Sequence, residues 1–116
     1  MPYIDVNISI KLSDHEKDVL KTKLGELISI IPGKTESGLM IGINDGYTMY
    51  FSGQKKEKVA YLNIKLYKQA EYEYKNELSK KIFEFFEKEY DITGYNLYMN
   101  FDEYSSWATR GSLNNQ

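Results

Sequence analysis

The chain has 116 residues, with 15 Lys and Arg against 17 Asp and Glu, one His, no Cys and a formal net charge of −2. This length predicts a single domain over residues 1–116 with a real core. The lack of cysteine excludes disulfides, a thiolate nucleophile and cysteine-ligated metals. The charge offers no global attraction to nucleic acid, and no apolar run approaches the roughly 20 residues of a membrane span. We therefore expect a soluble, cytoplasmic protein.

The first predicted elements are a strand and a helix. Residues 3–10 alternate apolar and polar side chains, which is typical of a half-buried strand. Ser13 and Glu16 have the spacing of a capping box, and apolar residues follow at helical intervals. Proline disfavours helical geometry in the residue before it, so we expect this helix to end at Pro32 and Gly33.

The middle of the chain predicts a reversal. Residues 39–43 and 47–51 are β-prone runs, and the residues between them include Asp45 and Gly46. An Asp-Gly pair tolerates the positive φ angles of a tight turn, so a hairpin or a sharp reversal is expected here. Residues 54–58 contain no apolar side chain and predict an exposed connection.

The pattern then restarts. Residues 60–67 alternate as a second strand, a helix is predicted over about residues 70–90, and residues 97–101 alternate as a further strand. The chain is therefore expected to be an α+β protein of two β-α-β units. Because β-α-β crossovers share one hand, both helices should cover one face of a four-stranded mixed sheet.

The other face of that sheet has an unusual composition. It mixes tyrosines with amides and charges, too aromatic for plain solvent and too polar for a core. This composition suggests contact with other subunits or with a ligand. The residues expected on it are Tyr3, Asp5, Asn7, Tyr61, Asn63, Lys65, Tyr67, Tyr98 and Asn100.

Pro2 is the candidate catalytic group. Initiator methionine is normally removed before a small residue such as proline, and removal of Met1 leaves Pro2 with a free secondary amine. An α-amino group titrates near 8, and burial or a nearby cation lowers its pKa, so it can act as a general base near neutral pH. The alternative is an ordinary proline at the start of a strand.

Several segments together resemble a known family. They are Pro2 opening an alternating strand, the Pro32-Gly33-Lys34 turn, Phe51-Ser52-Gly53, residues 97–101, and Gly111-Ser112-Leu113. In order and spacing the chain resembles the tautomerase superfamily, and within it the macrophage migration inhibitory factor and phenylpyruvate tautomerase branch. The resemblance implies a homotrimer and a cofactor-independent, metal-free isomerase. Its implied reaction is keto–enol tautomerisation of a 2-oxo acid such as phenylpyruvate.

The same resemblance implies residue roles. Pro2 matches the catalytic base, and Lys34 matches the lysine that holds the substrate carboxylate. Tyr67 matches a position whose backbone N–H meets that carboxylate. Tyr98 and Asn100 match residues that a neighbouring subunit contributes to the pocket. The alternatives are a solvated loop lysine for Lys34, and interface packing for Tyr98 and Asn100.

The chain also departs from the family pattern. Gly38, Thr109 and Leu113 stand where relatives carry aromatic residues, while Trp107 is retained two positions earlier than the usual tryptophan. We expect a wider or wetter pocket, with weaker affinity for an aryl substrate. Arg110 could supply a second cation, although a solvated arginine is the simpler interpretation.

Other groups of residues give weaker indications of a functional site. His15 has no second ligand at metal spacing, and nothing in the sequence brings Asp45, Asp102 and Glu103 together. Two alternative functions remain open. One is a trimeric, cytokine-like interaction protein that keeps the fold without its chemistry. The other is nucleic-acid binding through lysines interleaved with tyrosines. Its candidate residues are Lys55, Lys56, Lys58, Lys65, Lys68, Tyr61 and Tyr67.

Overall fold

The computed structural model describes residues 1–115 and is built on a four-stranded sheet of order β2-β1-β5-β6. Its strands are β1 (Pro2–Ile8), β2 (Met40–Asn44), β5 (Ala60–Tyr67) and β6 (Leu97–Tyr104). The central strands β1 and β5 are antiparallel, and each outer strand is parallel to its central neighbour. The predicted mixed sheet of two β-α-β units is confirmed.

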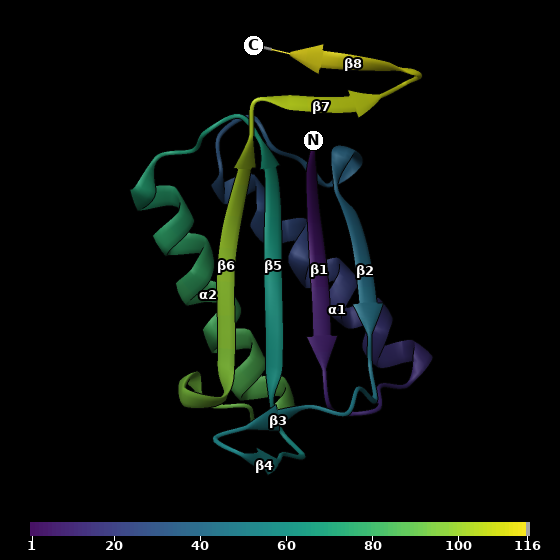
Figure 1. Ribbon diagram of the computed structural model, residues 1–116, viewed down its shortest axis with the longest axis vertical. Helices are drawn as coiled ribbons and strands as arrows, with labels where there is room; N and C mark the ends of the chain where they lie inside the picture. Colours follow the sequence, from purple (N-terminus) through teal and green to yellow (C-terminus); the bar gives the residue numbers. More distant parts are fainter. Residues whose placement is uncertain (116) are drawn as a thin grey trace.

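Both helices, α1 (Asp14–Leu27) and α2 (Tyr72–Tyr90), cover the same face of the sheet (Figure 1). The predicted capping box is present: Ser13 Oγ accepts from the Glu16 N–H at 3.1 Å, and Glu16 Oε1 accepts from the Ser13 N–H at 2.8 Å. The first helix ends before Pro32, because its last turn tightens into the 3-10 helix η1 (Ile28–Ile30).

The core lies between this sheet face and the two helices. The alternation of β1 and β5 directs their aliphatic side chains towards the helices, where they are fully buried. Apolar residues of the two helices cover these strand side chains. Side chains with no solvent exposure include Ile4, Val6, Ile8, Leu62, Ile64, Leu66, Leu20, Leu78, Ile82 and Phe86. This burial of aliphatic surface is what holds the two β-α-β units together.

The opposite face is polar and aromatic, as expected, but it is not uniformly exposed. Tyr98 is 62% exposed, whereas Asn63 is only 6% exposed and Tyr67 only 8%. Asn63 is covered because its amide donates to Asn100 Oδ1 at 2.6 Å and to Asp102 Oδ2 at 3.1 Å. These cross-strand bonds let a buried amide keep its hydrogen bonds.

Of the two alternatives expected between residues 39–43 and 47–51, the hairpin is wrong, whereas the chain does bend at Gly46, which has φ 60°. Strand β2 pairs in parallel with β1, and β3 (Tyr50–Phe51) forms a small hairpin with β4 (Gln54–Lys55). The Asp45-Gly46 segment instead docks on the chain that follows β1: the Leu12 N–H donates to Asp45 Oδ2 at 2.8 Å. Tertiary hydrogen bonds therefore hold the Asp45-Gly46 bend, and no hairpin ladder forms between the two flanking segments.

A second small hairpin ends the described chain. It consists of β7 (Ser106–Thr109) and β8 (Ser112–Asn115), joined by Arg110 and Gly111 at φ 55° and 85°. Two successive positive φ angles are typical of a two-residue hairpin turn. The hairpin lies across the end of the main sheet where the N-terminus lies (Figure 1). Sequence patterns predicted neither this hairpin nor the extension of β6 beyond residue 101.

Charge follows exposure along the helices. The 19-residue α2, longer than the 14-residue α1, carries lysines and glutamates on its exposed side.

In residues 1–115 no helix combines the length and apolar character needed to cross a bilayer. Over that same stretch, no group of three or more His, Asp or Glu could hold a metal ion.

Candidate active site

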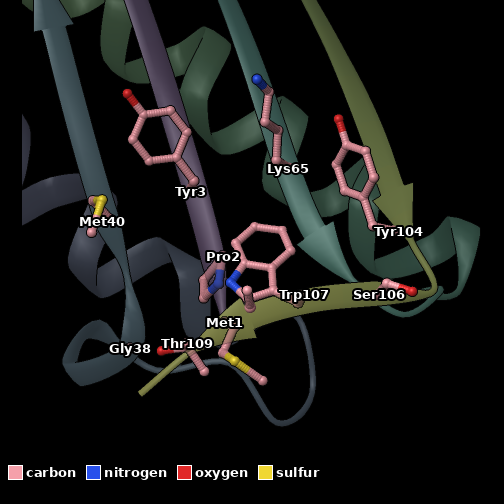
Figure 2. A pocket seen from close by; sticks show the side chains of 11 residues that line it. Met1, Pro2, Tyr3, Gly38, Met40, Lys65, Tyr104, Ser106, Trp107 and Thr109 are labelled. Carbon is pink, nitrogen blue, oxygen red and sulfur yellow. The ribbon is translucent and has the colours of Figure 1, made fainter. Parts of the chain in front are cut away.

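The N-terminal end of the sheet carries a pocket of about 550 Å³ around Pro2. Pro2 opens β1, is buried, and lies opposite Leu66 of β5. Figure 2 shows side chains from β1, β2, β5, β6 and β7 around it. The lining residues are Met1, Pro2, Tyr3, Gly38, Met40, Lys65, Tyr104, Ser106, Trp107, Ala108 and Thr109.

Trp107 supplies the main aromatic wall. Its ring is directed towards Pro2 (Figure 2) and packs edge-on against Tyr104, with the ring centroids 6.0 Å apart. Tyr104 ends β6 and Trp107 lies in β7, which follows after one residue, so the change of direction between these strands brings both rings to the pocket. The aromatic pair makes this wall apolar, which favours binding of a carbon skeleton.

Met1 fills the edge of this pocket. The backbone N–H of Tyr67 donates to the Met1 carbonyl oxygen at 3.3 Å. Burial, followed by the positive charge of Lys34, lowers the pKa of the Met1 amino group. An amine at this end of β1 therefore lies in surroundings that disfavour its protonated form.

A glycine turn positions Lys34 beside the same group. The Lys34 N–H donates to the Ile31 carbonyl oxygen at 3.1 Å, with Gly33 at φ 82° between them. A residue with a Cβ is strained at that angle, so the Pro-Gly pair determines where Lys34 leaves the turn. Lys34 Nζ donates to the Tyr67 carbonyl oxygen at 3.0 Å. Burial lowers its pKa, and the charge of Lys68 acts in the same direction.

The structure therefore brings Pro2, Lys34 and the Tyr67 backbone to one end of the sheet. Tyr67 contributes its N–H and its carbonyl there, while its side chain is buried. Lys34 does not line the pocket itself, but its charge acts on the Met1 amino group that does. The catalytic and carboxylate-binding roles that the resemblance implies stay predictions.

Tyr98 and Asn100 lie elsewhere in the same chain. Pro2 is level with Glu103 of β6 through Leu66, whereas Asn100 is level with Asp5 and Tyr98 with Asn7. A strand rises about 3.3 Å per residue, so Tyr98 lies roughly 17 Å along the sheet from the level of Pro2. A single chain therefore does not bring these two residues to its own pocket.

Local contacts hold Tyr98 near the far end of β6 and Asn100 at the middle of that strand. The Tyr98 ring contacts Phe51 edge-on, with the centroids 5.4 Å apart. Asn100 Oδ1 accepts from Asn63 and from the Tyr61 hydroxyl, the latter at 3.1 Å.

The departures from the family pattern separate into two groups. Gly38 and Thr109 line the pocket and offer it no ring, in agreement with the expected wider rim. Leu113 is 64% exposed on β8 and does not line the pocket. Arg110 occupies the exposed turn of the hairpin, away from the lining. The structure thus favours the solvated interpretation of Arg110.

The remaining candidates do not converge. Asp45 binds the Leu12 N–H, and Asp102 accepts from Asn63. Glu103 accepts from the Ala70 N–H and from Lys75, and His15 is exposed at the start of α1. The lysines proposed for nucleic acid divide between the β3–β4 end and the Pro2 end, and the Tyr67 ring is buried.

Sequence reasoning placed Tyr3 and Lys65 on the helix-free face but not in the pocket, and it missed Met40 and Tyr104. The burial of β6 alternates as far as Tyr104, but in the sequence Asp102 and Glu103 interrupt the alternation of apolar and polar residues, so the signal ends at Phe101. Met40 carries no such signal, because its place depends on the parallel pairing of β2 with β1.

Comparison with known proteins gives one family. The family model described as macrophage migration inhibitory factor (MIF) matches residues 1–113. Among solved structures, Leishmania major MIF2 has a TM-score of 0.88 at 19% identity, over 98% of this chain and 97% of that one. The MIF-like protein of Entamoeba histolytica has a TM-score of 0.84 at 22% identity, over 97% and 98% of the two chains.

The fold is also shared by a solved structure that is not named as a MIF. Pt0534, solved after inactivation by 2-oxo-3-pentynoate, has a TM-score of 0.83 at 12% identity, covering 95% of this chain and 93% of that one. A search among curated proteins finds no match. The fold supports a tautomerase-type or MIF-like function. With nearly its whole length matched by the family model, the chain belongs to the macrophage migration inhibitory factor family.

Proposed function

We propose that this protein is a cofactor-independent tautomerase that interconverts the keto and enol forms of a 2-oxo acid such as phenylpyruvate. Pro2 is the general base, Lys34 and the Tyr67 N–H bind the substrate carboxylate, and Trp107 covers the carbon skeleton. The active form is a cytoplasmic homotrimer, in which a neighbouring subunit adds Tyr98 and Asn100 to each pocket.

The position of Met1 carries this proposal. Its carbonyl oxygen accepts from the Tyr67 N–H, and its amino group lies under the influence of Lys34. The Tyr67 N–H and Lys34 are the two groups that we assign to binding of the substrate carboxylate. Removal of Met1 frees the Tyr67 N–H and leaves the Pro2 nitrogen as a secondary amine beside them. Peptide-bonded Pro2 has no such basicity.

The surroundings also suit a base. Burial and the charge of Lys34 lower the pKa of an amine at this end of the chain, as they do for Met1. A lowered pKa increases the unprotonated fraction of an amine near neutral pH, and the unprotonated form can accept a proton. In the proposed reaction Pro2 takes the proton from the enol oxygen and returns one to the adjacent carbon, so the composition of the substrate does not change.

The test joins N-terminal processing to activity in one sample. Intact-mass spectrometry of active protein should show a chain lacking Met1, and 2-oxo-3-pentynoate should add its mass to Pro2 and abolish activity. Pro2→Gly should lower kcat/KM at least tenfold, about 1.4 kcal/mol of transition-state stabilisation. A chain with one extra uncleaved residue before Pro2 is the matched control and should be inactive. Full activity in protein that retains Met1 would contradict the Pro2 mechanism.

A second function is favoured by the open rim. Gly38 and Thr109 leave the pocket without aromatic rings at their positions, which weakens the desolvation of Pro2. A correctly processed trimer without tautomerase activity would support a cytokine-like interaction protein of the same fold.

A further inference from the structure

Two lysines approach Tyr67 from different directions. Lys34 Nζ lies 3.0 Å from the Tyr67 carbonyl oxygen, and Lys68 Nζ lies 5.2 Å from the centroid of the Tyr67 ring. Lys34 arrives from the turn after η1, and Lys68 directly follows β5. Two positive charges therefore flank one buried residue at the Pro2 end of the sheet.

No carboxylate of the described residues neutralises this pair. Ion pairs within 4.0 Å form at five other lysines, which are Lys11, Lys17, Lys58, Lys75 and Lys81. The nearby Glu103 is engaged by Lys75 at 3.1 Å and by the Ala70 N–H at 2.7 Å. The charge of Lys68 is felt at Lys34, where it lowers the pKa. Unpaired like charges beside a pocket attract an anion.

The backbone at Lys68 is also unusual. Its φ is 72°, in the left-handed region that glycine adopts freely and other residues adopt at a cost. Its N–H donates to the Tyr104 carbonyl oxygen at 2.7 Å, which holds the residue at the end of β6. Lys68 does not line the Pro2 pocket but an adjoining depression, and Tyr104 lines both. Asp102 of that depression accepts from the Asn63 amide at 3.1 Å. Strained residues of this kind cluster at binding sites, where the side chain has a use that offsets the strain.

We propose that Lys68 is a second anion-binding residue of this site and that the preferred substrate is a 2-oxo dicarboxylate. This inference rests on the proposed function. One carboxylate binds Lys34 and the Tyr67 N–H, and the other is held by Lys68. Pro2 moves the proton between the enol oxygen and the carbon that lies between the ketone and the second carboxylate. No oxidant or further reactant takes part.

The experiment compares a diacid with a monoacid. Enolisation of oxaloacetate and of phenylpyruvate is measured with the processed wild type, Lys68→Gln, Lys68→Gly and the control Lys80→Gln. Lys80 is exposed on α2, on the helix side of the sheet, and makes the same change in charge. Lys68→Gln and Lys68→Gly should each lower kcat/KM for oxaloacetate about 5- to 10-fold and change the value for phenylpyruvate less than twofold. Lys80→Gln should change neither.

Lys68→Gly answers the question of folding. It removes the charge and also relieves the left-handed strain, so the variant should unfold at a denaturant concentration no lower than that of the wild type. Equal losses for both substrates, or no loss for oxaloacetate, would overturn the proposal.

The outcomes also separate this inference from the proposed function. If phenylpyruvate turnover requires Pro2 but oxaloacetate turnover does not change in the Lys68 variants, the proposed function stands and the preference for a diacid is refuted. If neither substrate reacts, the proposed function fails. Calorimetric binding of succinate against butyrate then decides the role of Lys68: at least fivefold weaker succinate binding in Lys68→Gln supports it, and unchanged binding refutes it.

Discussion

Lys34 lies between the proposed carboxylate-binding group at Tyr67 and the amine at the start of the chain. It bonds the Tyr67 carbonyl at 3.0 Å, and its charge reaches the amine at the chain end. A neutral residue at this position removes an ammonium from the proposed carboxylate site and a positive charge from beside the proposed base. These two effects are measurable separately.

The first effect is on substrate binding. Lys34→Ala should lower kcat/KM for a 2-oxo acid 10- to 150-fold, because a charge-assisted contact contributes about 1.5–3 kcal/mol. The loss should fall mainly on KM if the contact is equal in the ground state and the transition state. Steady-state kinetics beside Lys80→Ala, an exposed lysine of α2, checks this. Undiminished turnover and KM would remove Lys34 from the site.

The second effect is on pH dependence. The Lys34 charge lowers the pKa of the neighbouring amine, so its removal lets that pKa rise. A base with a higher pKa stays protonated to higher pH. The acidic limb of the kcat/KM profile should therefore move to higher pH in Lys34→Ala and stay in place in Lys34→Arg. A limb that does not move in Lys34→Ala would contradict the coupling.

At the scale of elements, the C-terminal end of α2 anchors the helix layer. Tyr90 packs against Phe86 and Phe85 with ring centroids 5.1 and 5.8 Å apart. The helix ends at Asp91 in the left-handed conformation, and the Ile92 N–H donates to the Phe86 carbonyl oxygen at 3.3 Å. This backbone arrangement satisfies carbonyls that the helix leaves free.

The Tyr90 hydroxyl gives this element a pH dependence. Burial raises the pKa of Tyr90 to about 12. An unfolded tyrosine titrates near 10, so the stability contributed by the neutral form is complete below about pH 10 and is lost as the pH rises towards 12. The free energy of unfolding should fall by up to about 2 kcal/mol over this window.

Tyr90→Phe isolates the contribution of this group. The variant keeps the ring packing and removes the titrating hydroxyl, so its stability should decline less between pH 10 and 12 than that of the wild type. Urea unfolding at several pH values measures the difference. Identical declines in the two proteins would show that Tyr90 does not titrate differently on folding.

At the scale of the whole molecule, the proposed pocket requires more than one chain. Tyr98 lies towards the end of the sheet opposite Pro2, where it is 62% exposed together with other aromatic residues, and Asn100 lies at the middle of β6. Sedimentation at micromolar concentration should therefore give a homotrimer. A stable monomer would contradict the shared site.

Mixing of variants tests the shared site directly. Pro2→Gly and Tyr98→Ala should each have reduced activity alone. In trimers reassembled from equal amounts, a site is intact when the subunit that supplies Pro2 is the Tyr98→Ala variant and the neighbour that supplies Tyr98 is the Pro2→Gly variant. Each of these two conditions has a probability of one half. Activity should recover to about a quarter of the wild-type value. No recovery would contradict a site that takes Pro2 from one subunit and Tyr98 from its neighbour.

Local sequence patterns predicted much of this molecule. The alternation of residues 3–10 and 60–67, the capping box at Ser13, and the Pro-Gly turn before Lys34 appear in the structure with shifts of a few residues at their ends. Each depends on neighbours within a few positions along the chain, where backbone preference and side-chain period act directly. The order of these elements and motifs also predicted the family, which the comparison confirms.

Only the tertiary structure decided the pairings between distant residues. The Asp45-Gly46 segment did not form a hairpin, because β1 offered β2 a parallel partner and the Leu12 N–H offered Asp45 a hydrogen bond. Asn63 became buried through bonds to side chains on β6. The hydrogen bond from Lys34 to the Tyr67 carbonyl joins residues 33 positions apart. Such contacts depend on how separate elements pack, and no local pattern of residue types encodes that packing.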